Sequence, residues 1–190
     1  MLESLQYLQH VSRFRSLTRE YWVEMTIALL ALLGLVELVV SHDEPNAPPS
    51  SLWFGFSAVV VLVLTLVARR RYPFAGPAAY WLLAAGISFV DAQLLPFMQS
   101  FFVIGMAAAF LLGNVRNSLK AAIGLPIVLA SAAIIVYMIP GHPTSLLVFL
   151  PIEFGISWLA GYVLRERATQ AEAAEERAAR AEREREAAAR

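Results

Sequence analysis

The stretch of sequence that decides the fold is residues 145–190, SLLVFLPIEFGISWLAGYVLRERATQAEAAEERAARAEREREAAAR. Its first part, up to Leu164, is almost wholly apolar and has the length of about 20 residues that crosses a bilayer core as a helix. From Arg165 onward the chain consists mainly of Ala, Glu and Arg, which are strong helix formers, and it contains no Gly or Pro. This pattern predicts one continuous helix that spans a membrane and then runs on into the cytoplasm.

Five more apolar stretches precede this one, and hydrophobic residues make up 58% of the chain. Such a composition is typical of a polytopic membrane protein rather than a water-soluble domain. The sequence therefore predicts an all-α fold, a membrane helix bundle over residues 22–164. Its six transmembrane helices are expected at about 22–40, 52–68, 78–95, 97–113, 121–139 and 145–164.

The third and fourth predicted helices come from one almost unbroken apolar region, residues 78–113. A single helix of that length would be about 50 Å long, well beyond the bilayer core. Polar residues and a proline interrupt the region at Asp91, Gln93, Pro96 and Gln99. We therefore expect two helices with a turn between them.

The orientation follows from the 15 Lys and Arg residues. Cytoplasmic loops of membrane proteins are enriched in these residues and translocated loops are depleted in them. The connections at 41–51, 96–99 and 140–144 contain none, so both termini are expected in the cytoplasm, with the chain in the plasma membrane. The basic residues lie at Arg13, Arg15, Arg19, Arg69–Arg71, Arg116, Lys120, Arg165, Arg167 and in the tail beyond.

The N-terminal segment, residues 1–21, is polar and mixed and does not resemble a signal peptide. Apolar residues recur there at every third position from Leu2 to Leu17. Two interpretations remain open. One is an interfacial helix held against the lipid bilayer by Arg13, Arg15 and Arg19, and the other is a loosely ordered lead-in.

The tail, residues 165–190, has the composition of a connector helix. Pairs such as Glu176 with Arg180 have the spacing that stabilises a single helix. An alanine-rich heptad also predicts a parallel homodimer, with Arg177 and Glu182 placed to bridge the two helices. The alternative is a solvated single helix, because an alanine seam buries little area. The heptad, which would form the relay, runs through Leu164, Arg167, Ala171, Ala174, Ala178, Ala181, Arg185 and Ala188.

Four acidic residues lie in or beside the predicted spans: Glu24, Glu37, Asp91 and Glu153. Ionisable groups in a membrane are costly, so they usually face the bundle interior, pair with another group or take part in function. Glu24 lies near a helix end and can reach the interface. Glu153 is the strongest sensing candidate because it lies well inside the span that leads to the tail, and Glu37 and Asp91 are further candidates.

His42 and His142 are the remaining sensing candidates, and both are expected on the outer side near Asp43 and Glu44. They can respond to pH, bind a transition metal or simply be solvated turn residues. Their spacing matches no established ligand motif, and the chain has no cysteine, so no metal site is predicted.

Prolines and glycines inside the predicted spans suggest where helices bend or approach closely. Pro126 and Pro151 are expected to kink the fifth and sixth helices. Gly155 and Gly161 are expected to allow close helix packing.

Sequence motifs of enzymes are not found, so no catalytic residue is predicted in these 190 residues. Nucleic-acid binding is not expected, because the basic residues of the tail are balanced by acids. A small ion-coupled or small-molecule transporter is the main alternative function, since intramembrane acids and interrupted helices would suit it. Its weakness is that the two halves of the chain show no repeat symmetry.

The segment LRERATQAEAAEERAARAEREREAAAR, residues 164–190, follows a helix bundle that has no large outer loop. This layout resembles the N-terminal membrane region of bacterial sensor histidine kinases that pair with LuxR-like response regulators. In that family the connector helix leads to a dimerisation and phosphoacceptor domain that opens with a Glu-Leu-His-Asp-like motif, and an ATP-binding domain follows. The resemblance implies a sensor module that relays a membrane or small-molecule stimulus through the last membrane helix.

The resemblance also implies what is missing here. No histidine follows His142, and no nucleotide-binding motif is present, so the phosphoacceptor and the site for ATP and Mg would lie in a kinase domain outside this chain. The chain itself is expected to need no cofactor. Its implied partners are a second copy of itself, the bilayer and, through the missing domains, a cognate response regulator.

Overall fold

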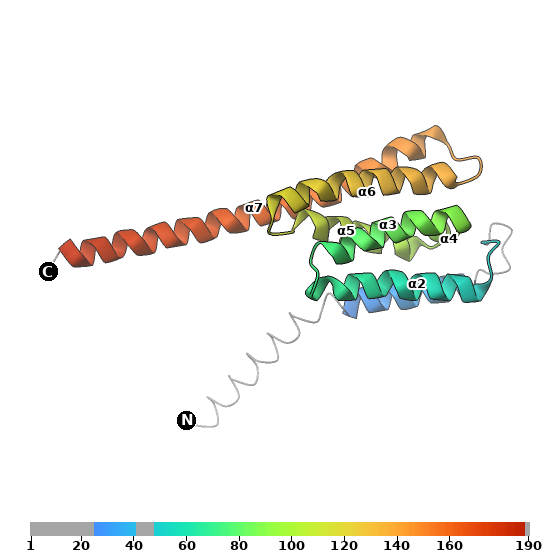
Figure 1. The fold of residues 1–190 in the computed structure, drawn as a ribbon, viewed down its shortest axis with the longest axis horizontal. Coiled ribbons are helices and arrows are strands. Elements are labelled where there is room, and N and C mark those ends of the chain that lie inside the picture. Colours follow the sequence, from blue (N-terminus) through green and yellow to red (C-terminus); the bar gives the residue numbers. More distant parts are fainter. Residues whose placement is uncertain (1–24, 41–47, 189–190) are drawn as a thin grey trace, which may run out of the picture.

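A computed structural model describes residues 25–40 and 48–188, and every regular element in these ranges is helical (Figure 1). A bundle of helices ends in one long helix that projects far beyond it. The predicted segment 1–21 and the residues Glu24, His42, Asp43 and Glu44 lie outside the described ranges. The all-α prediction is confirmed for the described part.

Each of the six apolar stretches forms a helix, and the bounds that the structure describes lie within five residues of the predicted ones, except that the last helix continues past Leu164 into the tail. The predicted start of the first stretch, residue 22, lies outside the described ranges. Both prolines, Pro126 and Pro151, lie inside helices that continue through them. The helices are Met25–Val40, α2 (Leu52–Val67, followed by the short 3-10 helix η1, Ala68–Arg70), α3 (Ala75–Val90), α4 (Leu94–Phe97), α5 (Gln99–Gly113), α6 (Ser118–Met138) and α7 (Thr144–Ala188).

The predicted break between the third and fourth stretches is present and takes the form of an elbow, residues 91–98. Asp91 ends α3 in an extended conformation, and its Oδ1 accepts hydrogen bonds from the backbone N–H groups of Gln93 at 2.9 Å and Leu94 at 3.1 Å. Met98 is extended again before α5 begins. Two helices therefore run side by side where one would have been too long.

The helices are held together by small and branched apolar side chains. α7 packs mainly on α5 and α6, while α3 contacts α2, α5 and α6. The largest fully buried side chains of this core include Trp81, Leu62, Leu66, Ile104, Leu112 and Val128. Alanines 108, 109, 121 and 132 are completely buried and let the helices lie close together.

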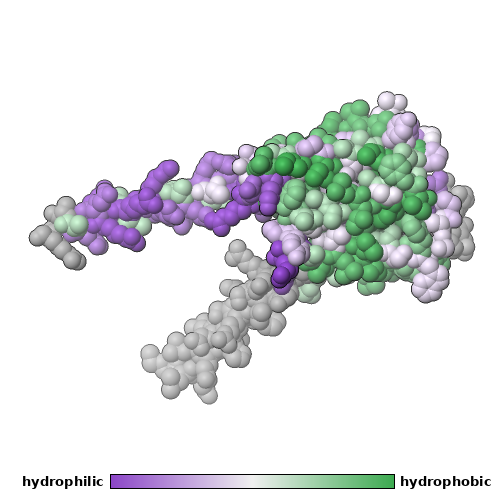
Figure 2. Space-filling model, in the orientation of Figure 1, coloured by the Kyte–Doolittle hydropathy of each residue, from purple (hydrophilic) through white to green (hydrophobic). Residues whose placement is uncertain are grey.

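The outer surface of the bundle is also apolar. Figure 2 shows hydrophobic side chains over its flank and hydrophilic ones along the projecting part of α7. Three of the described helices, starting at Leu52, Ser118 and Thr144, are long and apolar enough to cross a membrane, and three more are apolar but shorter. A water-soluble protein rarely exposes such a surface, so a covering of lipid or protein is required.

The closest approach in the bundle is between α5 and α7. A Cβ atom added to Gly113 would overlap the carbonyl oxygen of Trp158, and one added to Gly161 would overlap that of Phe110. The prediction of close packing is thus confirmed at Gly161. At Gly155 a Cβ atom would make only an ordinary contact, 3.5 Å from the Leu129 side chain.

The Gly161→Ala substitution should therefore destabilise the bundle, by about 1–3 kcal/mol if it behaves like other overpacking changes. The measurement is thermal unfolding of the purified protein in detergent. Gly86→Ala is the matched control, because Gly86 lies exposed in α3 with nothing near its missing Cβ. Alanine there should be neutral or slightly stabilising. Equal stability of the two variants would contradict the described helix crossing.

Candidate functional site

The residue at which α7 leaves the bundle is Arg165. It is only 7% exposed, whereas the side chains that follow it, from Glu166 to Ala187, are exposed except for the partly buried Ala173. We call residues 166–188 the stalk, and the end of the bundle from which it emerges the stalk end (Figure 1). Arg165 thus marks the junction between the bundle and the stalk.

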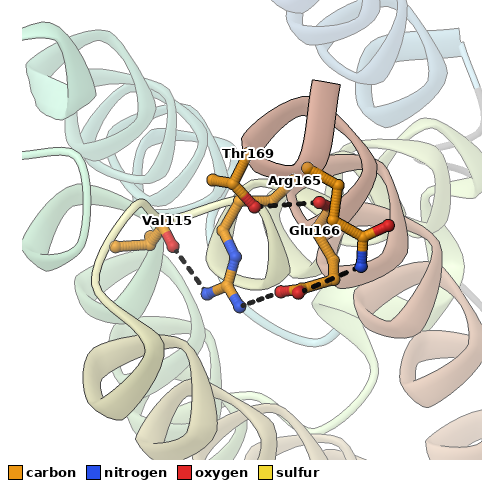
Figure 3. Close-up of polar contacts among 5 residues, drawn as sticks. Val115, Arg165, Glu166 and Thr169 are labelled. Atoms are coloured by element: carbon orange, nitrogen blue, oxygen red, sulfur yellow. Dashed lines mark hydrogen bonds and ion pairs between the residues drawn. The ribbon is translucent and has the colours of Figure 1, made fainter. Parts of the chain in front are cut away.

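The guanidinium group of Arg165 contacts three other residues. Its Nη1 donates a hydrogen bond to the Val115 carbonyl at 3.0 Å, and its Nη2 lies 3.7 Å from Glu166 Oε2 (Figure 3). The ring of Tyr162 lies against it, 4.5 Å from ring centroid to guanidinium carbon. A buried arginine is tolerated only with such partners. Because Val115 belongs to the loop between α5 and α6, this contact ties α7 to both helices.

A second set of contacts between α7 and its neighbours lies two turns earlier, at Trp158. The indole Nε1 of Trp158 donates to the Ala121 carbonyl in α6 at 3.1 Å, and its ring stacks on Tyr162 at 5.3 Å. Gly161 lies between these residues and rests on the α5 backbone. We call this set the exit clamp; it comprises Trp158, Gly161, Tyr162 and Arg165 of α7 with Gly113, Val115 and Ala121.

Beyond the exit clamp, the contacts of the stalk are weak and local. Arg116 reaches Glu172 at 4.0 Å, but both side chains are largely exposed. The expected pair of Glu176 and Arg180 forms at 3.4 Å and is also exposed. Exposed ion pairs contribute about 0–1 kcal/mol. The stalk is therefore held to the bundle mainly by the exit clamp.

The predicted relay residues all lie along the exposed part of α7. Leu164 is 54% exposed, and Ala171, Ala174, Ala178 and Ala181 are exposed on the stalk. Within a single chain these alanines bury almost nothing. The heptad seam between two chains stays a prediction.

Two of the sensing candidates have structural roles at the other end of the bundle. Glu37 Oε2 accepts from Ser100 Oγ at 3.0 Å and from its backbone N–H at 3.4 Å, in the first turn of α5. Asp91, 2% exposed, caps α4 and also accepts from the Ser50 backbone N–H at 3.2 Å. Both carboxylates thus satisfy N–H groups that a helix start or a turn leaves without partners.

Glu153 does not face the bundle interior. It is exposed on α7, with Ile152 and Ile156 exposed beside it. A carboxylate in such apolar surroundings is costly, so Glu153 remains a sensing candidate.

The histidines do not form a visible site. His142 lies in the turn between α6 and α7, where its Nδ1 is 3.0 Å from the Ile139 carbonyl and its ring is 5.5 Å from that of Tyr137. His42 lies outside the described ranges. Within those ranges no group of three or more His, Asp or Glu residues is placed to hold a metal ion.

The exit clamp escaped sequence reasoning almost entirely. Arg165 counted only as one more cytoplasmic charge, and Trp158 as one more apolar residue. The signal that was present is the set of aromatic, glycine and arginine positions at 158, 161, 162 and 165, which share one helix face. Their partners, Val115 and Ala121, accept through backbone carbonyl groups, which every residue has. The sequence therefore does not indicate which residues are the partners.

Replacing Arg165 with Gln should loosen the stalk, because a hydrogen bond made by a charged group is worth about 1.5–3 kcal/mol. The chain has no cysteine of its own. Two introduced cysteines, at Leu119 in α6 and at Ala168 on the stalk, are therefore the only sites that a spin label will modify. The distance distribution between them should be narrow in the parent and broad in Arg165→Gln. Arg167→Gln, which changes a neighbouring exposed arginine, is the control and should leave the distribution narrow.

Comparison with known proteins returned no match to any family model, curated protein or solved structure. The function of this chain therefore has to be inferred from its own residues and geometry.

Proposed function

We propose that this chain is the membrane-embedded input module of a sensor histidine kinase, and that α7 relays a stimulus from the bundle to a kinase domain outside the chain. The observation that carries the proposal is the unbroken length of α7, 45 residues from Thr144 to Ala188. At about 1.5 Å per residue this helix is about 67 Å long, so it reaches well beyond a bilayer. A rigid helix passes rotation or tilt from one end to the other.

The proposed topology has six membrane crossings with both termini in the cytoplasm. Its support is the position of the basic residues at the stalk end. Arg69 and Arg70, after α2, line one shallow cleft together with Arg116 from the loop between α5 and α6. Arg165 lies at this end as well, because it bonds to Val115 of the same loop. The positive-inside rule assigns such an end to the cytoplasm.

Two of the proposed crossings are shorter than a full bilayer core. α3 has 16 residues and α5 has 15, or about 22–24 Å at 1.5 Å per residue. A bilayer adapts to such short helices by local thinning, at a modest cost. The elbow of residues 91–98 adds further buried apolar residues at the outer ends of α3 and α5, among them Leu94, Leu95 and Met98.

The proposed partner of the stalk is the stalk of a second copy. Alone, the stalk is a solvated helix with a row of small residues, and pairing would cover that row. An alanine seam is weak, so the membrane must supply the effective concentration needed for pairing. Weak pairing suits a relay, because a stimulus of a few kcal/mol can then change the register or rotation of the pair.

In the proposed mechanism the exit clamp is the fixed point about which α7 rotates or tilts. A stimulus alters the packing of the outer half of α7, and the clamp converts that change into a rotation or tilt of the stalk. The kinase domain, with its phosphoacceptor histidine and its ATP and Mg site, would follow the stalk and act on a response regulator. Glu153 belongs to the outer half of α7 and is retained as an input candidate.

The transporter alternative gains no support from the described acids. Ion coupling needs carboxylates that are free to bind and release an ion or a proton. Glu37 and Asp91 are engaged with backbone N–H groups, and Glu153 faces away from the bundle. We therefore propose no second function.

The topology can be tested with single cysteines in intact cells. A membrane-impermeant thiol reagent should label cysteines at Ser50 and Thr144, because both are placed at the outer end. A cysteine at Ser118 should be labelled only after the cells are opened. Labelling at position 118 in sealed cells would refute the six-span arrangement.

The relay can be tested by disulfide crosslinking of the membrane-bound protein. Cysteines at the seam positions Ala174 and Ala181 should crosslink two copies more readily than cysteines at Glu172 and Ala179, since only the former face the partner helix in the heptad. All four positions are exposed in one chain, so differences in access do not explain a difference. Equal crosslinking at all four, or none at any, would argue against a paired stalk.

A further inference from the structure

A cavity of about 300 Å³ lies in the half of the bundle away from the stalk. Its walls come from α3, the elbow of residues 91–98, the first turns of α5, the end of α6 and the start of α7. Pro96, Gln99 and Phe102 at its edge are exposed, while Tyr80, Trp81 and Phe101 in its wall are buried. This volume is at the lower end of the range for small-molecule sites.

The chemistry of the wall is apolar and aromatic, and none of its residues is charged. It includes the rings of Tyr80, Trp81, Phe101, Phe102 and Phe154. An ion or a charged ligand would lose its hydration there without gaining a partner. Rigid aromatic walls favour a flat ring, which can stack or meet them edge-on, over a flexible hydrocarbon chain.

Neither Tyr80 nor Trp81 offers the cavity a free polar group. The Tyr80 hydroxyl donates to the Phe101 carbonyl at 3.4 Å. The indole nitrogen of Trp81 has no acceptor among the described atoms, but it is covered by other atoms of the protein and does not open onto the cavity. These two residues therefore present rings rather than hydrogen-bonding groups to an occupant.

The cavity adjoins the face of α7 that carries the exit clamp. Leu146, Leu150 and Phe154 line it at intervals of four residues, and Trp158 follows one turn later. The Phe154 ring meets that of Trp81 edge-on at 4.7 Å and that of Phe102 at 5.4 Å. An occupant of the cavity would therefore press directly on the outer half of α7.

We propose that this cavity binds a small, uncharged aromatic molecule, whose rings pack against those of Trp81, Phe102 and Phe154. The proposed binding site follows from the cavity and does not depend on the proposed function. Its role as the input to the stalk does rest on the proposed function. In that role, a bound ligand shifts Phe154 and with it α7.

Benzophenone is a suitable probe, because it has two aromatic rings, one carbonyl acceptor and no charge, and it forms covalent bonds to nearby C–H groups under near-ultraviolet light. The full chain in lipid nanodiscs should be labelled saturably, and mass spectrometry should place the label on residues lining the cavity. Diphenylmethane, which has two rings but no carbonyl, should compete about as well as unlabelled benzophenone. A flexible alkane of similar size should compete about 2- to 10-fold less well, because it lacks the ring contacts with the aromatic walls.

Two variants distinguish binding in the cavity from binding to the surrounding surface. Leu150→Trp fills the cavity and should abolish saturable labelling, whereas Val148→Trp, on the same helix at a position 55% exposed and outside the lining, should leave it intact.

Three outcomes would overturn the proposal: labelling that does not saturate, equal labelling of Leu150→Trp and the parent, or a tightly retained phospholipid whose acyl chain is found in the cavity. These measurements do not depend on stalk pairing. If the probe binds but the stalk does not crosslink, the proposed relay is refuted and the proposed binding site is supported. If the stalk crosslinks but the probe does not bind, the binding site is refuted and the paired stalk is supported.

Discussion

The contact on which the rest of this structure depends is the approach of α5 and α7 at Gly113 and Gly161. Neither position has room for a Cβ atom against the opposing backbone. At this separation Arg165 reaches the Val115 carbonyl, and Trp158 reaches the Ala121 carbonyl in α6. Two glycines thus set a helix spacing that two longer side chains then secure with hydrogen bonds, and α7 leaves the bundle from a fixed point.

The two halves of the bundle treat polar groups differently. At the stalk end the polar groups that face the core are paired with backbone carbonyls, and Ser157 adds a hydrogen bond of 2.7 Å to the Met106 carbonyl. At the other end there is a cavity, lined by apolar and aromatic side chains. Tightly packed interiors resist deformation, whereas a cavity allows side chains to move. The half of the bundle away from the stalk can therefore rearrange more easily than the stalk end.

The fate of the acidic residues illustrates why sensing candidates are hard to identify from sequence. The sequence ranked Glu153 above Glu37 and Asp91 by its depth in a predicted span. In the fold, Glu37 and Asp91 accept hydrogen bonds from backbone N–H groups at helix starts and turns, and Glu153 faces outward. The cost of a buried charge is readable from sequence, but the group that offsets it belongs to another element.

The positions of the helices were determined by sequence alone, including the break within residues 78–113 and the continuous helix from the last apolar stretch into the tail. Hydropathy, helix propensity and bilayer-scale length act locally along the chain, so no tertiary information is needed to read them. The exit clamp and the cavity were decided only by the tertiary structure. Both depend on which helices are neighbours and on backbone atoms such as the carbonyls of Val115 and Ala121, which every residue possesses and which no sequence pattern marks.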